Sequence, residues 1–246
     1  MLLWTIGDSW TDPYFWDVGP NGWPAQVAAD LGLELVNNGA GGAGYVNVAP
    51  LPTTFPHEAV DRPAAGADVA VVFGSVNDQA QAPIAVHLAA LVTYRAIRDV
   101  APAAPLIVVG PQFWDAPVPA HLFAIRDAVA AAAEIVGATF VDALGWMQGR
   151  PELLGPDAAH PNTAGQRMLA DRITPIVELE LVRSRPTGSL DRVDGALQFP
   201  VAFPADFTGS DAPPLPPSAR EGWLAFPSRF PSSLEDDPVE DLAPVA

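Results

Sequence analysis

Three residues of the sequence have the types and spacing needed for nucleophilic catalysis. Ser9 follows the apolar run 2–6 directly, in a Gly-Asp-Ser turn. A serine hydroxyl becomes reactive when a neighbouring imidazole takes its proton, and that imidazole needs an acceptor on its other nitrogen. Asp157 lies three residues before His160, close enough in a turn for the carboxylate to reach the ring. We therefore expect Ser9 as nucleophile, His160 as its base and Asp157 as the residue that orients His160.

Two further segments could stabilise the negative charge that such an attack builds on a carbonyl oxygen. Residues 38–44 read Asn-Gly-Ala-Gly-Gly-Ala-Gly and could offer backbone N–H groups that no side chain shields. Asn77 could add a side-chain amide donor, and we expect Asp78 to brace that turn. Glycine-rich loops also bind phosphates, but the phosphate-binding loop uses a lysine, and this chain contains none. The pattern favours an oxyanion site over a nucleotide site.

The elements that must position these residues alternate along the chain. Short apolar segments alternate with longer Ala/Leu-rich segments of helical period, which is typical of a parallel sheet with crossover helices. We expect five strands, at 2–6, 34–37, 67–73, 105–109 and 138–141. We expect four helices, at 23–31, 85–100, 119–136 and 162 to about 182. Because some strands are almost wholly apolar, both faces of the sheet should be covered. The sequence therefore predicts an α/β fold, a three-layer α/β/α sandwich.

This architecture predicts where the site lies. In open parallel sheets, ligands bind outside the carboxyl ends of the strands. The residues that directly follow four of the predicted strands are those at 7–9, 38–42, 74–78 and 110–112. Most of the candidate residues fall in these segments, so we expect them to meet at one edge of the sheet.

Composition excludes several functional classes. The formal net charge is −17, all twelve basic residues are arginine, and the pI is near 4.3, so we do not expect a nucleic-acid partner. The absence of cysteine removes disulfides and thiolate metal ligands, and no His/Asp/Glu cluster suggests a metal. Attack by a serine with a histidine base needs no cofactor, so we expect none. No apolar run is long enough to span a bilayer, and residues 1–6 are too short for a signal peptide. We expect a soluble protein, and an extracellular or virion-associated location stays open.

The composition changes after the last predicted helix. Eleven of the 28 prolines lie from residue 186 onward, and helical periodicity is lost. We therefore divide the chain into a domain at 1–182 and a Pro-rich acidic extension at 183–246. The extension contains six aromatic residues between 199 and 230, which disfavours a purely disordered tail. Two alternatives remain, an arm that packs on the domain or on another chain, and a mostly flexible tail.

The motifs together resemble those of a known family. Ser9 in Gly-Asp-Ser, Gly42 in the glycine-rich loop, Asn77 in Gly-Ser-Val-Asn-Asp, and His160 in Asp-Ala-Ala-His-Pro-Asn resemble, in order and spacing, the four blocks of the SGNH/GDSL hydrolases. The resemblance covers roughly residues 1–182. It implies a flavodoxin-like sandwich and an oxyanion hole made by the N–H groups of Ser9 and Gly42 and the amide of Asn77. Ser75 departs from the family pattern, where many members have glycine.

The resemblance also implies an activity, which is hydrolysis of carboxylic esters through a Ser-His-Asp triad. We expect short O-acyl groups, such as acetyl, on a carbohydrate or cell-envelope polymer. The alternatives are a lipase or thioesterase acting on longer acyl chains, and a non-catalytic glycan- or host-surface-binding module of a virion or secreted assembly. A fainter resemblance is to SGNH domains in tail proteins of actinobacterial phages. Because Trp10 and Trp114 follow strand ends, we expect them to contact substrate.

Overall fold

The computed structural model describes residues 1–13, 21–50, 52–74 and 76–184. The predicted extension lies outside this part of the chain, apart from its first two residues. Its expected packing is therefore a prediction that the described residues do not address. Residue 75, at which the family pattern departs, also lies outside them.

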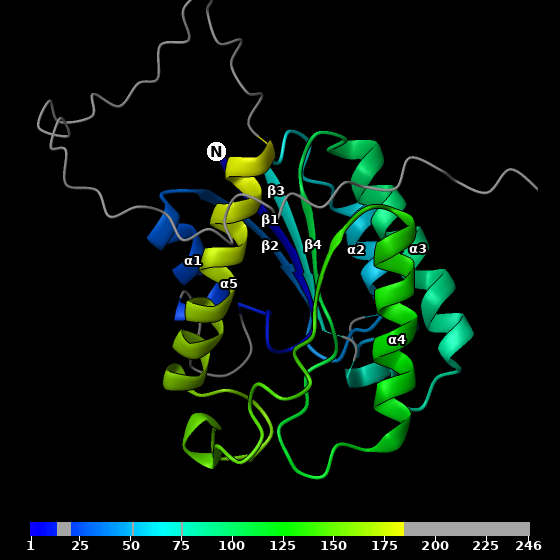
Figure 1. The fold of residues 1–246 in the computed structure, drawn as a ribbon, viewed down its shortest axis with the longest axis vertical. Coiled ribbons are helices and arrows are strands. Elements are labelled where there is room, and N and C mark those ends of the chain that lie inside the picture. Colours follow the sequence, from blue (N-terminus) through cyan, green and yellow to red (C-terminus); the bar gives the residue numbers. More distant parts are fainter. Residues whose placement is uncertain (14–20, 51, 75, 185–246) are drawn as a thin grey trace, which may run out of the picture. The chain divides into compact units, whose positions relative to one another are not determined.

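The centre of the fold is a parallel sheet of five strands (Figure 1). The strands are β1 (Leu2–Gly7), β2 (Glu34–Gly39), β3 (Val69–Phe73), β4 (Leu106–Val109) and β5 (Thr139–Val141). Their order is β2-β1-β3-β4-β5, and every neighbouring pair is parallel. All five predicted strands are confirmed, with ends that differ by at most two residues.

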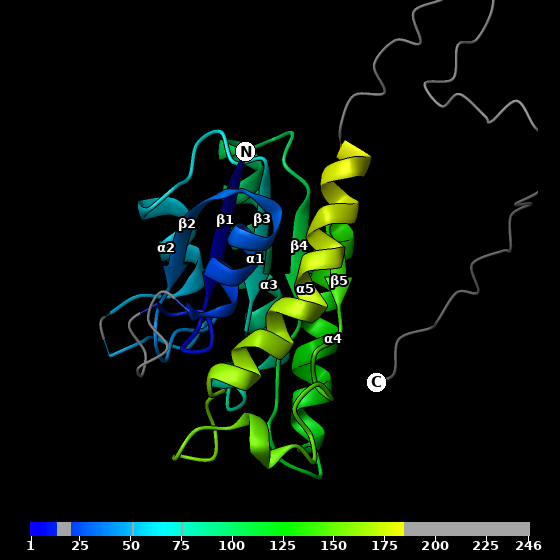
Figure 2. The same cartoon turned by 90° about the vertical axis from the view of Figure 1, so that its left-hand side faces the viewer.

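Helices cover both faces of the sheet. Helices α1 (Trp23–Leu31) and α5 (Thr163–Ser184) lie on one face, and α2 (Phe55–Asp61), α3 (Pro83–Val100) and α4 (Ala120–Ile135) lie on the other (Figure 1). Turned by 90°, the molecule shows α5 running beside α1 along its face of the sheet (Figure 2). The predicted three-layer α/β/α sandwich is therefore confirmed.

The position of the central strand β3 explains why its sequence is apolar without interruption. Val69, Val71 and Phe73 pack in the core beneath α1 and α5, whereas Ala70 and Val72 pack in the core on the α2–α4 side. All five side chains are at most 1% exposed. Side chains alternate between the two faces of a strand, so a strand covered on both faces must be apolar at every position.

Helix α2 is not among the elements predicted from the sequence. It begins after Thr54, whose hydroxyl accepts a hydrogen bond from the N–H of His57, and it has Pro56 in its first turn. Threonine at the N-cap and proline at the helix start are both favourable. The sequence does not predict this short helix, because the nearby Pro50 and Pro52 indicate a loop. Among the described residues, no helix combines the length and the apolar character needed to cross a bilayer.

Candidate active site

Ser9 lies in a tight turn at the carboxyl end of β1. The carbonyl of Asp8 accepts hydrogen bonds from the N–H groups of Thr11 (3.0 Å) and Asp12 (2.9 Å), which closes the turn around Ser9. A Cβ at position 7 would lie 2.2 Å from the hydroxyl of Thr11, so the last residue of β1 must be glycine. The turn leaves Ser9 half-buried, while its neighbours Asp8 and Trp10 are buried.

His160 contacts Ser9 across 151 positions of sequence. Its Nε2 lies 2.8 Å from the Oγ of Ser9, and its Nδ1 is hydrogen-bonded to Oδ2 of Asp157. The side chains of His160 and Asp157 are 23% and 25% exposed. The structure therefore brings together all three residues of the predicted triad, in an arrangement that can transfer a proton from the hydroxyl to the imidazole.

The turn that contains His160 and Asp157 is fixed by its own backbone. The N–H of Gly155 donates to the carbonyl of His160 (2.7 Å), and Leu154 forms an antiparallel bridge with Pro161. Ala158 has a φ of 55°, which lets the chain reverse between Asp157 and His160. This closed turn directly precedes α5.

Asp157 is held as an acceptor by several donors. Its Oδ1 accepts from the N–H groups of Ala159 (3.2 Å) and His160 (3.1 Å), while Oδ2 faces the imidazole. Partial burial raises the pKa of Asp157, but the hydrogen bonds from His160 and from the two N–H groups lower it by more. The net pKa of Asp157 lies below its ordinary value, which favours the carboxylate form beside His160.

Gly42 lies in the loop that follows β2. Its φ of 83° is in the left-handed region that favours glycine. The side-chain amide of Asn47 donates to the carbonyl of Gly42 (2.8 Å), and the N–H of Gly41 donates to Asp12 (2.8 Å). The glycine-rich loop is therefore fixed on both sides of Gly42, and one of these anchors comes from the turn that contains Ser9.

Asn77 and Asp78 connect the end of β3 to the same loop. The side-chain Nδ2 of Asn77 donates to the carbonyl of Ala43 over 2.8 Å. The buried carboxylate of Asp78 accepts from three consecutive backbone N–H groups, those of residues 45 (2.7 Å), 46 (2.9 Å) and 47 (2.7 Å). The side chain of Asp78 thus anchors the glycine-rich loop. At position 44, a Cβ would lie 2.6 Å from this carboxylate, so close approach requires glycine.

Asp8, directly before Ser9, is completely buried. Its Oδ2 accepts from the side-chain amide of Gln112 (2.8 Å), and its Oδ1 accepts from the N–H of Trp10 (3.0 Å). Burial is the main cause that raises the pKa of Asp8 to about 6, and these hydrogen bonds limit the rise. Gly74 makes room for the carboxylate, because a Cβ there would lie 2.8 Å from its Oδ2.

The structure corrects the position expected for one of the two tryptophans. Trp10 is 2% exposed and packs edge-on against Phe73, with ring centroids 6.3 Å apart, so it belongs to the core. A turn residue that follows a strand end can point back beneath the sheet edge as well as outward. Trp114 is half-buried and stacks on Phe113 with centroids 4.9 Å apart. Its contact with substrate stays a prediction.

Sequence reasoning missed several polar residues around the site. Gln112 follows a predicted strand, but nothing in its type indicates a partner 104 positions away. The contact between Glu58 and Arg62 is not predicted, because α2 is not predicted. Their i,i+4 spacing is nevertheless the signal of an ion pair on a helix. Within the described ranges, no group of three His, Cys, Asp or Glu residues is arranged to hold a metal ion.

Comparison with known proteins identifies the family of the chain. Residues 5–168 match the GDSL-like Lipase/Acylhydrolase family. The chain is 37% identical over 189 residues to the GDSL lipase Rv0518 of Mycobacterium tuberculosis, a match that covers 72% of this chain and 81% of that protein.

Solved structures share the fold. A family two carbohydrate esterase from Clostridium thermocellum, solved in complex with cellohexaose, is 19% identical with a TM-score of 0.59, and the match covers 74% of this chain and 64% of that one. TesA is 18% identical with a TM-score of 0.58, and the match covers 73% of this chain and 99% of TesA. Because the family match spans most of the sequence and the lipase relative is identical at more than a third of the aligned positions, the chain belongs to the GDSL-like lipase/acylhydrolases and is a carboxylic ester hydrolase.

Proposed function

We propose that this hydrolase is a serine esterase in which Ser9 attacks the ester carbonyl, His160 accepts the proton of Ser9, and Asp157 orients His160. The observation that carries the proposal is the chain of contacts from the Oγ of Ser9 to Nε2 of His160 (2.8 Å), and from Nδ1 of His160 to Asp157. The turns that contain these three residues are closed by backbone hydrogen bonds. The geometry therefore needs little rearrangement before the proton moves.

The reaction follows from these contacts in two halves. Attack by Oγ on the carbonyl carbon forms a tetrahedral intermediate as Nε2 takes the hydroxyl proton. Collapse of the intermediate expels the alcohol, which receives that proton from His160, and leaves the acyl group on Ser9. A water molecule then gives a proton to the same Nε2 and attacks the acyl carbon. Release of the carboxylic acid restores the hydroxyl of Ser9.

We assign the oxyanion hole to the N–H groups of Ser9 and Gly42 and to the side-chain amide of Asn77. The amide nitrogen of Asn77 has two hydrogens, of which one is used for the carbonyl of Ala43, so the other can reach a substrate oxygen. The anchors on either side of Gly42 support a hole that is already formed before substrate binds. Donors fixed in advance supply a large share of catalysis in acyl transfer.

For the substrate, we propose short O-acyl groups, such as acetyl, on a carbohydrate or cell-envelope polymer. The supporting observation is a cavity with mixed polar and apolar walls beside the glycine-rich loop, which suits a hydroxylated alcohol better than an aliphatic chain. A specific finding favours the alternative of longer acyl chains, because the relative that is 37% identical is named a lipase. Rates on p-nitrophenyl acetate and p-nitrophenyl octanoate separate the two. Preference for octanoate would contradict the short-acyl proposal.

The test of the proposed chemistry is Ser9→Ala compared with the unaltered chain. We expect the variant to lose hydrolysis of p-nitrophenyl acetate and to resist labelling by a fluorophosphonate, which reacts with activated serines. Equal activity in both proteins would reject Ser9 as the nucleophile. Absence of both activity and labelling in the unaltered chain would favour the binding-module alternative.

A further inference from the structure

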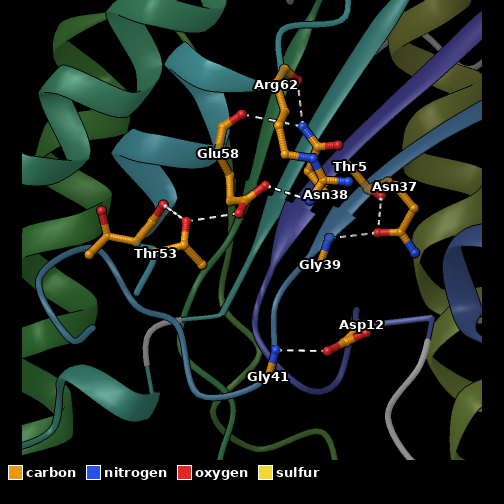
Figure 3. A network of polar contacts seen from close by, with 10 residues as sticks. Thr5, Asp12, Asn37, Asn38, Gly39, Gly41, Thr53, Glu58 and Arg62 are labelled. Carbon is orange, nitrogen blue, oxygen red and sulfur yellow. Dashed lines mark hydrogen bonds and ion pairs between the residues drawn. The ribbon is translucent and has the colours of Figure 1, made fainter. Parts of the chain in front are cut away.

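A cavity of about 390 Å³ lies at the carboxyl end of β2, beside the glycine-rich loop. Its volume is within the range of small-molecule sites, which is roughly 300 to 1,000 Å³. Asp12 and Gly41 form part of its wall, and these two residues are hydrogen-bonded to each other over 2.8 Å (Figure 3). The cavity therefore borders the loop that contains Gly42.

Asp12, which lines the cavity, also contacts the turn that contains Ser9. Asp12 belongs to the turn of Ser9, because its N–H donates to the carbonyl of Asp8 (2.9 Å). At position 39 a Cβ would lie only 2.5 Å from the backbone nitrogen of Asp12, so the loop and the turn are in close contact. A molecule in this cavity would contact the turn that contains Ser9 and the residue that precedes Gly42.

The polar side of the cavity is a network of hydrogen bonds around Glu58 of α2 (Figure 3). Glu58, with a side chain only 6% exposed, accepts from the hydroxyl of Thr53 (2.8 Å) and from the guanidinium of Arg62 (2.9 Å). The side-chain amide of Asn38, at the end of β2, donates to the carbonyls of Glu58 (3.3 Å) and Arg62 (2.6 Å). Both ends of the ion pair are thus fixed to the sheet.

This network leaves hydrogen-bonding capacity at the cavity. The side chain of Arg62 is 55% exposed and has five N–H donors, of which the contact with Glu58 engages one nitrogen. The hydroxyl of Thr53 donates to Glu58, so its oxygen can accept from a ligand. The lining also has an apolar part, which includes Pro13, Ala49 and Pro52.

The lining selects one class of occupant. Two carboxylates, Asp12 and Glu58, line the cavity together with one guanidinium, so a further anion such as a phosphate or free carboxylate is disfavoured. Donors and acceptors combined with C–H surface match a ring that carries hydroxyl groups at its edge. A long aliphatic chain has no polar group that could form a hydrogen bond with Arg62 or Thr53.

We propose that this cavity is the subsite for the alcohol half of the ester and binds a sugar ring through Arg62 and Thr53. The proposal rests on the proposed function, because it places the acylated hydroxyl of that sugar next to Ser9. After acyl transfer to Ser9, the sugar would leave from this cavity as the free alcohol. The sugar can be a monomer or one unit of a polymer.

The test measures the ratio of kcat/KM for a sugar ester to kcat/KM for p-nitrophenyl acetate, which has no sugar. Two sugar esters are used, methyl 6-O-acetyl-glucopyranoside and an acetylated xylan. We expect Arg62→Gln to lower the ratio about tenfold for at least one of them, mainly through KM, because a hydrogen bond to a charged group is lost. The monomer and polymer arms identify which source of the sugar is bound. An unchanged ratio for both esters would overturn the proposal.

A second variant and a matched control guard against a folding defect. Thr53→Val keeps the shape of the side chain but removes its hydroxyl, and we expect a smaller fall in the same ratio, about threefold. Arg126→Gln is the control, because Arg126 also pairs with carboxylates, Asp127 and Asp142, but lines a different cavity. The ratio should be unaltered in this control. An equal fall of this ratio in Arg126→Gln would show that the loss of any arginine lowers it. That result would overturn the proposed subsite.

The outcome can be separated from that of the proposed function. If Ser9→Ala abolishes turnover of every ester while Arg62→Gln leaves the ratio unaltered, the esterase proposal stands and the subsite is rejected. If Arg62→Gln instead alters only the preference between acetate and octanoate, the cavity binds the acyl half and the proposal is overturned. Binding of methyl glucopyranoside to Ser9→Ala, measured by calorimetry, should weaken in the double variant with Arg62→Gln.

Discussion

Gln112 donates a hydrogen bond of 2.8 Å to Asp8, a fully buried carboxylate that directly precedes Ser9. The contact joins the end of β4 to the end of β1, so the turn of Ser9 is fixed from across β3. Burial raises the pKa of Asp8 to about 6, well above the ordinary range of a carboxyl group. The pH dependence of stability should report on this residue.

The first prediction concerns the free energy of unfolding of Asp8→Asn. The folded-state pKa of Asp8, about 6, is above its ordinary value of 3.8, so folding favours the protonated form. The stabilising contribution of that form is present below the unfolded pKa and is lost as pH rises through about 6. Because asparagine does not titrate, the native chain should lose stability relative to the variant by about 2 kcal/mol between pH 4 and pH 8. Urea unfolding of both proteins at several pH values measures this. A stability difference that is constant with pH would contradict the assignment.

The second prediction concerns Asp157→Asn. We expect kcat for p-nitrophenyl acetate to fall by about 10³- to 10⁴-fold, because an amide at this position favours the wrong tautomer of His160. The fold should be retained, since an amide oxygen can still accept from the N–H groups of Ala159 and His160. Glu152→Gln is the control, because Glu152 is an exposed carboxylate in the same segment that pairs with Arg150. A fall of less than about tenfold in Asp157→Asn would remove Asp157 from the triad.

The third prediction concerns Asn77→Ala. Loss of one oxyanion donor should lower kcat by about 10²- to 10³-fold. Circular dichroism and the thermal midpoint should be little affected, because Asp78 still anchors the glycine-rich loop. Gln79→Ala, which removes an exposed amide two residues away, should leave kcat unaltered. If kcat in Asn77→Ala drops less than about threefold, the oxyanion contacts a different donor.

The fourth prediction compares two glycine substitutions. In Gly44→Ala the new Cβ would lie 2.6 Å from the carboxylate of Asp78, which must move away from the backbone N–H groups that it binds. Hydrogen bonds to a charged group contribute roughly 1.5 to 3 kcal/mol, so we expect a loss of about 2 kcal/mol in stability together with a lower kcat. In Gly145→Ala nothing lies within 4 Å of the new Cβ, and stability should stay nearly the same. Equal unfolding midpoints for the two variants would argue against this role of Gly44.

The parts of the fold that could be predicted from sequence are those with a local signal. Helix α1 has the predicted bounds, because Gly22, Pro24 and Gly32 mark its two ends. Helix α2 lacks such a signal, since its seven residues follow several prolines. The length of a periodic segment therefore determines whether an element can be recognised.

The same distinction applies to the candidate site. The Ser9, Asn77 and His160 segments each follow a recognisable pattern of strand end or turn, so their meeting at one sheet edge could be predicted. The burial of Trp10 and the contact between Gln112 and Asp8 depend on side-chain direction in the folded chain. No local pattern of residues carries that information.

The closed turn from Gly155 to Pro161 holds His160 and Asp157 together. Because His160 and Asp157 lie within one hydrogen-bonded loop, they must travel as a unit whenever that loop shifts relative to the sheet. Such a shift would change the distance from the imidazole to Ser9 while leaving the imidazole–carboxylate contact intact. In the proposed triad, the distance between Ser9 and this turn is therefore the one that such a shift would change.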